Sequence, residues 1–111
     1  MAMSTMRDIS CIDQSKAGIV SALCDMAETI DIINRIIIFG SAASKTCLSD
    51  SDIDICYDLK CSARDKRARE LSVITSKICE YNCDIVFYTL IGDNLKREID
   101  TNGVVVFEKD A

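Results

Sequence analysis

Apolar residues recur along this chain at two spacings, which predict helices alternating with short strands. Residues 9–30 carry Ile, Leu and Met at intervals of three and four, broken only by Lys16, the pattern of an amphipathic helix of about five turns. Short apolar runs predict strands at 35–39, 52–57, 83–88 and 104–107, and helices are expected at 41–46, 62–81 and 93–101. This order predicts an α/β (α+β) sandwich with the helices on one side of the sheet.

The second and third long helices have recognisable signals of their own. The segment Ser62-Ala63-Arg64-Asp65 is similar to a capping box, with Asp in place of the usual Glu at its last position. The inward-facing residues that the spacing predicts are Leu71, Ile74, Ile78 and Tyr81 in one helix, and Leu95 and Ile99 in the other. Asn102-Gly103 predicts a tight turn before the last strand.

A polar motif separates the first two predicted strands. Gly40-Ser41 ends the first strand, ten residues follow, and Asp52-Ile53-Asp54 opens the second. A glycine after a strand lets the backbone approach a ligand closely, and free N–H groups with the Ser41 hydroxyl can hold phosphate oxygens. Asp52 and Asp54 leave the same face of a strand about 7 Å apart, where carboxylate oxygens suit Mg²⁺. The motif therefore predicts a site for a nucleotide and magnesium.

A calcium-binding loop and a phosphotransferase nucleophile both fit the acidic run less well. An EF-hand loop beginning at Asp50 would place Ile55 where Gly is required and Cys61 where a bidentate Glu is required. A phosphotransferase that uses the first Asp as its nucleophile normally has apolar residues before that Asp, whereas here they follow it. A chance coincidence of a turn and a solvated acidic loop remains the bland alternative.

Length and composition indicate one domain, residues 1–111. Hydrophobic residues make up 49% of the chain and charged residues 28%, the balance of a soluble globular protein. No apolar run is long enough for a membrane span, and residues 1–10 lack the apolar core of a signal peptide, so we expect a cytoplasmic protein without a membrane partner.

Cysteine content and net charge argue against a zinc protein and against a dedicated nucleic-acid binder. The seven cysteines form no Cys-x-x-Cys pair and the chain has no histidine, which argues against a zinc site and favours reduced thiols. The net charge of −5 argues against a dedicated nucleic-acid binder. A basic cluster between Lys60 and Arg69 is interpreted as a solvated helix face, with contact to a triphosphate or a nucleic acid as the alternative.

The motif Gly-Ser-x10-Asp-x-Asp between two strands resembles the signature of nucleotidyltransferases of the DNA polymerase beta superfamily. The short chain resembles the minimal members, the MNT proteins, which are often encoded beside a HEPN-domain toxin as its antitoxin. The resemblance covers nearly the whole chain, from Ile9 to Phe107, and implies a mixed four-stranded sheet with the active carboxylates on its exposed face. It also implies a third carboxylate on a later strand, and Asp84 matches this position.

The resemblance implies a role for each matched residue. Gly40 and Ser41 hold the triphosphate, Asp52 and Asp54 hold Mg²⁺ (two ions in the family), and Asp84 completes the metal site and takes the proton of the acceptor. It implies transfer of AMP from ATP to a hydroxyl, a tyrosine of a HEPN-type toxin. A chain of this size has little surface to enclose an acceptor, which another protein or a second copy would then supply.

The turn departs from the usual family sequence Gly-Ser-Arg-Ala-Arg-Gly. Ala42 and Ser44 replace two arginines, and Lys45 replaces a glycine, leaving Lys45 as the candidate to return one positive charge to the phosphates. Three functions therefore stay open: an active enzyme that modifies a toxin, an antitoxin that only binds, and a nucleotidyltransferase for a small molecule such as an antibiotic.

Overall fold

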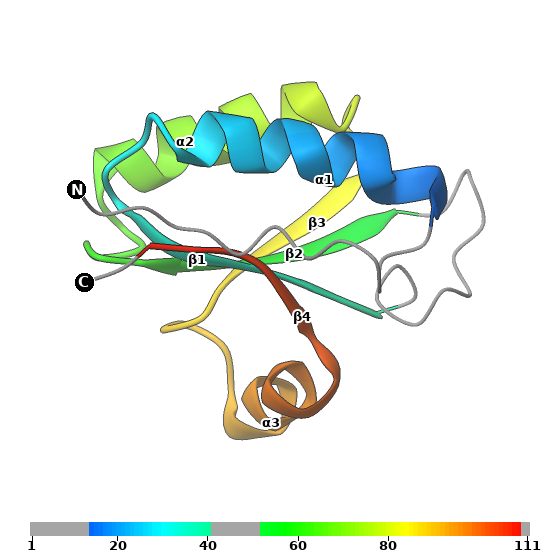
Figure 1. The fold of residues 1–111 in the computed structure, drawn as a ribbon. Helices are drawn as coiled ribbons and strands as arrows, with labels where there is room; N and C mark the ends of the chain where they lie inside the picture. The colour runs from blue at the N-terminus through cyan, green and yellow to red at the C-terminus, as the bar shows by residue number, and fades with distance from the viewer. Residues whose placement is uncertain (1–13, 41–51, 110–111) are drawn as a thin grey trace.

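The computed structural model describes residues 14–40 and 52–109, which form three helices and one four-stranded sheet (Figure 1). In chain order the elements are α1 (Gln14–Ala27), β1 (Ile33–Phe39), β2 (Ile53–Leu59), α2 (Lys66–Ile78), β3 (Cys83–Phe87), α3 (Asp93–Asn102) and β4 (Val104–Glu108). The strand order is β3-β2-β1-β4. β1 pairs antiparallel with both β2 and β4, whereas β2 and β3 are parallel and are connected through α2. The sheet is therefore mixed, as expected.

The main core lies between one face of the sheet and the pair of helices α1 and α2. Alternate residues of β1 and β2 point into it, as the period of two requires: Ile36, Ile38, Ile53, Ile55 and Tyr57 are all fully buried. The helices contribute Val20, Leu23, Cys24, Ala27, Ala68 and Leu71. Figure 1 shows both helices covering this face side by side.

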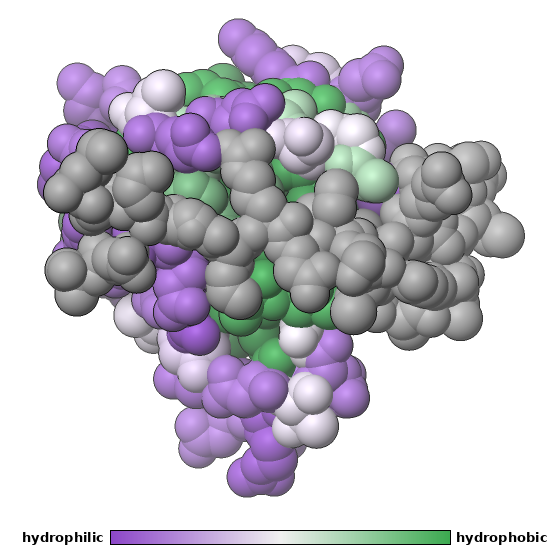
Figure 2. Space-filling model, in the orientation of Figure 1, coloured by the Kyte–Doolittle hydropathy of each residue, from purple (hydrophilic) through white to green (hydrophobic). Residues whose placement is uncertain are grey.

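The expectation that all helices lie on one side of the sheet is wrong for α3. α3 packs on the opposite face, where Ile99 joins a second, smaller cluster with Ile37, Phe39 and Cys56 (Figure 1). Gly103 makes this possible, because a Cβ at that position would lie 2.7 Å from the Ile37 side chain. Because β1 is apolar on both faces, helices pack against both sides of the sheet. The outer side of α3 is mostly hydrophilic (Figure 2).

α2 begins later than its sequence predicts, and a different set of its residues faces the core. Asp65 is the N-cap rather than the third helical residue, since its carboxylate accepts a hydrogen bond from the Arg67 N–H at 2.9 Å. Leu71 is buried as expected, but Ile74 is 40% exposed and Tyr81 is 72% exposed. Thr75 takes the buried position instead, and its hydroxyl lies 2.6 Å from that of Tyr57. A polar residue whose hydroxyl is hydrogen-bonded thus occupies one of the inward-facing positions of α2.

The first helix is described from Gln14 onward, and the predicted helix at 41–46 lies outside the described residues. Lys16, which interrupts the apolar spacing, is nevertheless only 3% exposed. Within the described ranges, no helix is long and apolar enough to cross a membrane.

Candidate nucleotide and metal site

The end of β1 brings the backbone of Gly40 against the side chain of Asp54. β1 and β2 pair Phe39 with Asp54, and Gly40 follows with a φ of 71°. A Cβ added to Gly40 would collide with a carboxylate oxygen of Asp54 and lie 3.1 Å from its Cγ. Both the backbone conformation and the lack of space therefore favour glycine here.

β2 presents its acidic residues on the face opposite α1 and α2. Ile53 and Ile55 are fully buried in the main core, so Asp54 between them points to the other side and is half-buried. Asp52 immediately precedes the strand and is exposed. The alternation predicted from sequence is thus observed, with one packed face and one that carries carboxylates.

Asp84 reaches the same place from β3. The parallel register pairs Asp54 with Asp84, so the two side chains leave neighbouring strands on the same face. Asp84 is exposed, and its carboxyl group lies close enough to that of Asp54 to raise the pKa of Asp54. Two carboxylates that are far apart in the sequence therefore meet beside Gly40.

The electrostatic environment of Asp54 disfavours its negative charge. Burial raises the pKa of Asp54 above its ordinary value of 3.8, and the charge of Asp84, a hydrogen bond with Asp84 and the charge of Asp52 raise it further. Like charges held this close are relieved by a proton or by a cation. The site is thus electrostatically suited to a positive ion.

The donors fit Mg²⁺ in type, although they do not form a closed cage. Among residues 14–40 and 52–109, no three acidic or thiol groups converge closely enough to hold a metal ion. Mg²⁺ is commonly held by one or two carboxylates, with water and substrate phosphates in the remaining positions. Asp54 and Asp84 supply such a pair, and the addition of Asp52 stays a prediction.

The remaining predicted nucleotide contacts lie beyond what the structure shows. Ser41 and Lys45 belong to residues 41–51, which are outside the described ranges. Gly40 is the one predicted phosphate-binding residue whose surroundings are defined.

A second polar group at the far end of the same sheet face was not singled out from sequence. Tyr88 follows β3, and its hydroxyl donates a hydrogen bond to Asp100 of α3. Arg35 of β1 and Lys96 of α3 each lie 5.1 Å from the centre of the Tyr88 ring. The sequence does contain one signal for Tyr88. Side chains alternate along a strand with a period of two, so Tyr88 lies on the same face as Asp84, which precedes it by four residues.

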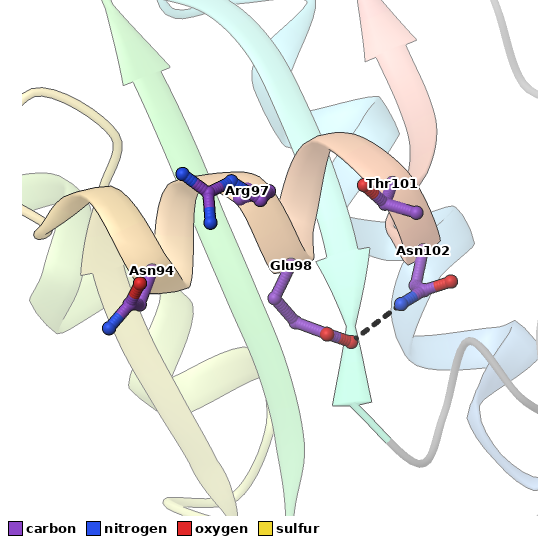
Figure 3. A pocket seen from close by; sticks show the side chains of 5 residues that line it. All are labelled: Asn94, Arg97, Glu98, Thr101 and Asn102. Carbon is purple, nitrogen blue, oxygen red and sulfur yellow. Dashed lines mark hydrogen bonds between the residues drawn. The ribbon is translucent and has the colours of Figure 1, made fainter.

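A shallow polar pocket lies apart from these residues, on the side of α3. It is lined by Asn94, Arg97, Glu98, Thr101 and Asn102 and has a volume of about 220 Å³ (Figure 3). The Asn102 amide donates a hydrogen bond to Glu98 at 3.0 Å, so the polar groups partly satisfy one another. It contains none of the predicted site residues.

Comparison with known proteins establishes the family. The family model described as "Polymerase beta, Nucleotidyltransferase" matches residues 22–111, and the chain belongs to this family. No curated protein matches the sequence.

Crystal structures of toxin–antitoxin complexes contain chains with the same fold. One, a toxin–antitoxin with AMP-PNP, is 24% identical, with 80% of this chain and 70% of that chain covered and a TM-score of 0.62. Another, an MNT antitoxin with the tri-AMPylated HEPN toxin of Shewanella oneidensis, is 21% identical, with 84% and 71% covered and a TM-score of 0.60. An MntA–HepT variant is 23% identical, with 78% and 68% covered and a TM-score of 0.61. At these identities the likeness shows the shared fold.

Proposed function

We propose that this chain is an antitoxin that transfers AMP from ATP to a tyrosine hydroxyl of a HEPN-type toxin. The observation that carries the proposal is the meeting of Gly40, Asp54 and Asp84 at the end of β1, on the sheet face away from α1 and α2. This arrangement combines a close backbone approach with two adjacent carboxylates, the parts that nucleotidyl transfer requires. Membership of the polymerase beta nucleotidyltransferase family supports the reaction type.

Three structural neighbours support the choice of nucleotide, acceptor and carboxylates. One complex contains the ATP analogue AMP-PNP, and another contains a HEPN toxin that carries AMP groups. In the MntA–HepT variant, two aspartates two positions apart are replaced by glutamate, and Asp52 and Asp54 have the same spacing. We extend these features to this chain on the strength of the shared fold.

In this proposal each residue at the site has one task. Gly40 lets the triphosphate approach the backbone, and Ser41 and Lys45 contribute a hydroxyl and a positive charge to it. Asp52, Asp54 and Asp84 hold Mg²⁺, which when bound neutralises phosphate charge and aligns the reacting oxygens. Asp84 is exposed next to Asp54 and accepts the proton of the incoming hydroxyl.

The acceptor hydroxyl comes from another molecule. The carboxylates lie at an open edge of the sheet, where Asp52 and Asp84 are both exposed. A protruding segment of a protein partner fits such an open site better than a small molecule that needs enclosure.

A binding-only antitoxin is the second candidate. It is favoured by the replacement of the usual arginines with Ala42 and Ser44. The adjacent pair Asp54 and Asp84 opposes it, because holding like charges close together is costly unless a cation binds between them.

The test is to incubate the chain with ATP, Mg²⁺ and a HEPN-domain protein encoded beside it. Intact-mass spectrometry should show AMP added to the partner, and peptide mapping should place it on a tyrosine. Asp54→Asn should abolish transfer, while Asp31→Asn, an exposed carboxylate outside the site, should leave it unchanged. A stable complex without any adduct would overturn catalysis and leave the binding-only antitoxin.

A further inference from the structure

The three tyrosines of the chain lie in three different environments. Tyr57 is fully buried in the main core, and Tyr81 is 72% exposed in the turn after α2. Tyr88 is half-buried at the end of β3, and its hydroxyl forms a hydrogen bond at the surface. Tyr88 differs from Tyr81 in the groups that surround its oxygen.

The hydroxyl of Tyr88 is paired with a carboxylate. It lies 2.9 and 3.0 Å from the two carboxylate oxygens of Asp100 on α3. This hydrogen bond raises the pKa of Tyr88, so the hydroxyl is protonated at neutral pH and needs a base in order to react. A weak nucleophile within hydrogen-bond reach of a carboxylate has the geometry of an activated nucleophile with its base.

Two cations flank the same side chain. The Arg35 guanidinium and the Lys96 ammonium each lie 5.1 Å from the ring centre. Arg35 is held by Asp58 at 2.9 Å, which partly neutralises it, whereas Lys96 lies on α3 one turn before Asp100. Positive groups fixed beside a nucleophile stabilise the charge of an attacked phosphate.

We propose that Tyr88 is itself a nucleotidyl acceptor, modified by a second copy of this chain; the inference rests on the proposed function. The Tyr88 oxygen attacks the α-phosphorus of ATP, the bond from that phosphorus to the bridging oxygen breaks, and pyrophosphate leaves. The phenolic proton passes to Asp100, which is already hydrogen-bonded to this hydroxyl and takes the place of Asp84 as its proton acceptor. The product is an AMP phosphodiester on Tyr88.

A second copy is required because the distance within one copy is too great. Tyr88 lies four residues beyond Asp84 in the strand direction, about 13 Å along the sheet. The Tyr88 hydroxyl forms its hydrogen bond at the surface, where a second molecule can reach it. The rate should therefore rise with the square of protein concentration.

Modification has a defined structural consequence. The esterified oxygen can no longer donate to Asp100, and the phosphate places a negative charge next to that carboxylate. The hydrogen bond between α3 and the end of β3 is thereby lost, and with it one of the links that fasten α3 to the sheet.

The first experiment uses the full chain with ATP and Mg²⁺ and no partner. Intact-mass spectrometry and peptide mapping should find AMP on Tyr88. Tyr88→Phe should remove the adduct, Tyr81→Phe should retain it, and Asp100→Asn should slow its formation by roughly 10²-fold. To test transfer between copies, Tyr88→Phe serves as the enzyme and Asp54→Asn as the acceptor, and only the acceptor should gain mass. An adduct that persists on Tyr88→Phe or maps to Tyr81 overturns the proposal.

A second experiment separates Tyr88 reactivity from the proposed function. An adenosine phosphorimidazolide, an activated nucleotide that transfers AMP without enzyme or metal, is added to the Asp54→Asn chain. Tyr88 should react faster than Tyr81, and Asp100→Asn should remove the preference. Equal reaction of the two tyrosines overturns the special reactivity of Tyr88 even if a HEPN partner is modified normally. If Tyr88 reacts preferentially with the imidazolide but neither Tyr88 nor a HEPN partner gains AMP from ATP and Mg²⁺, the proposed function is overturned and enzymatic modification of Tyr88 with it. AMP on the partner but never on Tyr88 overturns the Tyr88 proposal alone.

Discussion

The backbone of Gly40 lies directly against the carboxylate of Asp54, so the turn that leaves β1 and the acidic face of β2 form one unit. Neither residue can change without affecting the other. The glycine has a positive φ, and the space that a side chain would need is occupied by the carboxylate that we propose as a metal ligand.

Replacing Gly40 by alanine should therefore impair both stability and nucleotide binding. The backbone conformation alone costs about 1–2 kcal/mol for a residue with a Cβ, and the collision displaces Asp54. Gly18→Ala is the matched control, because a Cβ there meets nothing within 4 Å and the helix gains roughly 0.5–1 kcal/mol. Chemical denaturation and calorimetry with ATP and Mg²⁺ measure the two effects. Equal behaviour of the two alanine variants would contradict the close approach.

Asp54→Asn should stabilise the metal-free protein at neutral pH. The folded-state pKa of Asp54 is raised above the ordinary value of 3.8. The stability that goes with the protonated carboxyl group is therefore fully present below the ordinary pKa and is lost as the pH rises through the folded-state pKa. Above that value the ionised carboxylate opposes folding, and the uncharged amide removes this cost. Thermal melts from about pH 3 to pH 8 should show the gain of the variant appearing as the pH rises. A gain of the same size at every pH would point to a different cause.

The alternation of apolar residues predicted most of the fold. Ile53 and Ile55 alternate with Asp52 and Asp54, so the buried and acidic faces of β2 followed directly from the period of two. The position of α3 did not follow, because β1 is apolar at consecutive positions and its pattern does not say which face a given helix covers. Ile37 next to Ile36 is the residue that required a second cover.

The sequence named the residues of the candidate site, but it did not show which of their carboxylates lie side by side in the folded sheet. The motif named Gly40, Asp52, Asp54 and Asp84, and the structure places Gly40, Asp54 and Asp84 together. Strand register decides which carboxylates meet, and sequence alone does not give the register of the parallel pair β2 and β3. Tyr88 was missed for a related reason, since its partners come from β1 and α3.

Glu80→Gly should stabilise the protein. Glu80 follows α2 with a φ of 53°, its N–H bonds to the Lys77 carbonyl, and the next N–H bonds to the Ser76 carbonyl at 2.7 Å. This is the helix-ending motif in which glycine is preferred, and relieving the strain of a side chain there is worth about 1 kcal/mol. Lys77→Gly, inside the last turn of α2, should cost a similar amount. Urea midpoints should move in opposite directions, and a loss of stability in both variants would argue against the positive φ.

Asp84→Asn should separate catalysis from binding. Asp84 is exposed, so the amide fits without strain, and Asp52 and Asp54 remain to hold the metal and the nucleotide. Transfer should nevertheless fall by at least roughly 10²-fold, the usual loss when a general base is removed. Calorimetry should find ATP affinity largely retained, and the variant should still bind a HEPN-type partner without modifying it. If the variant forms the adduct at the wild-type rate, Asp84 takes no proton in the reaction; if it loses ATP binding as completely as Asp54→Asn, its role is to hold the metal.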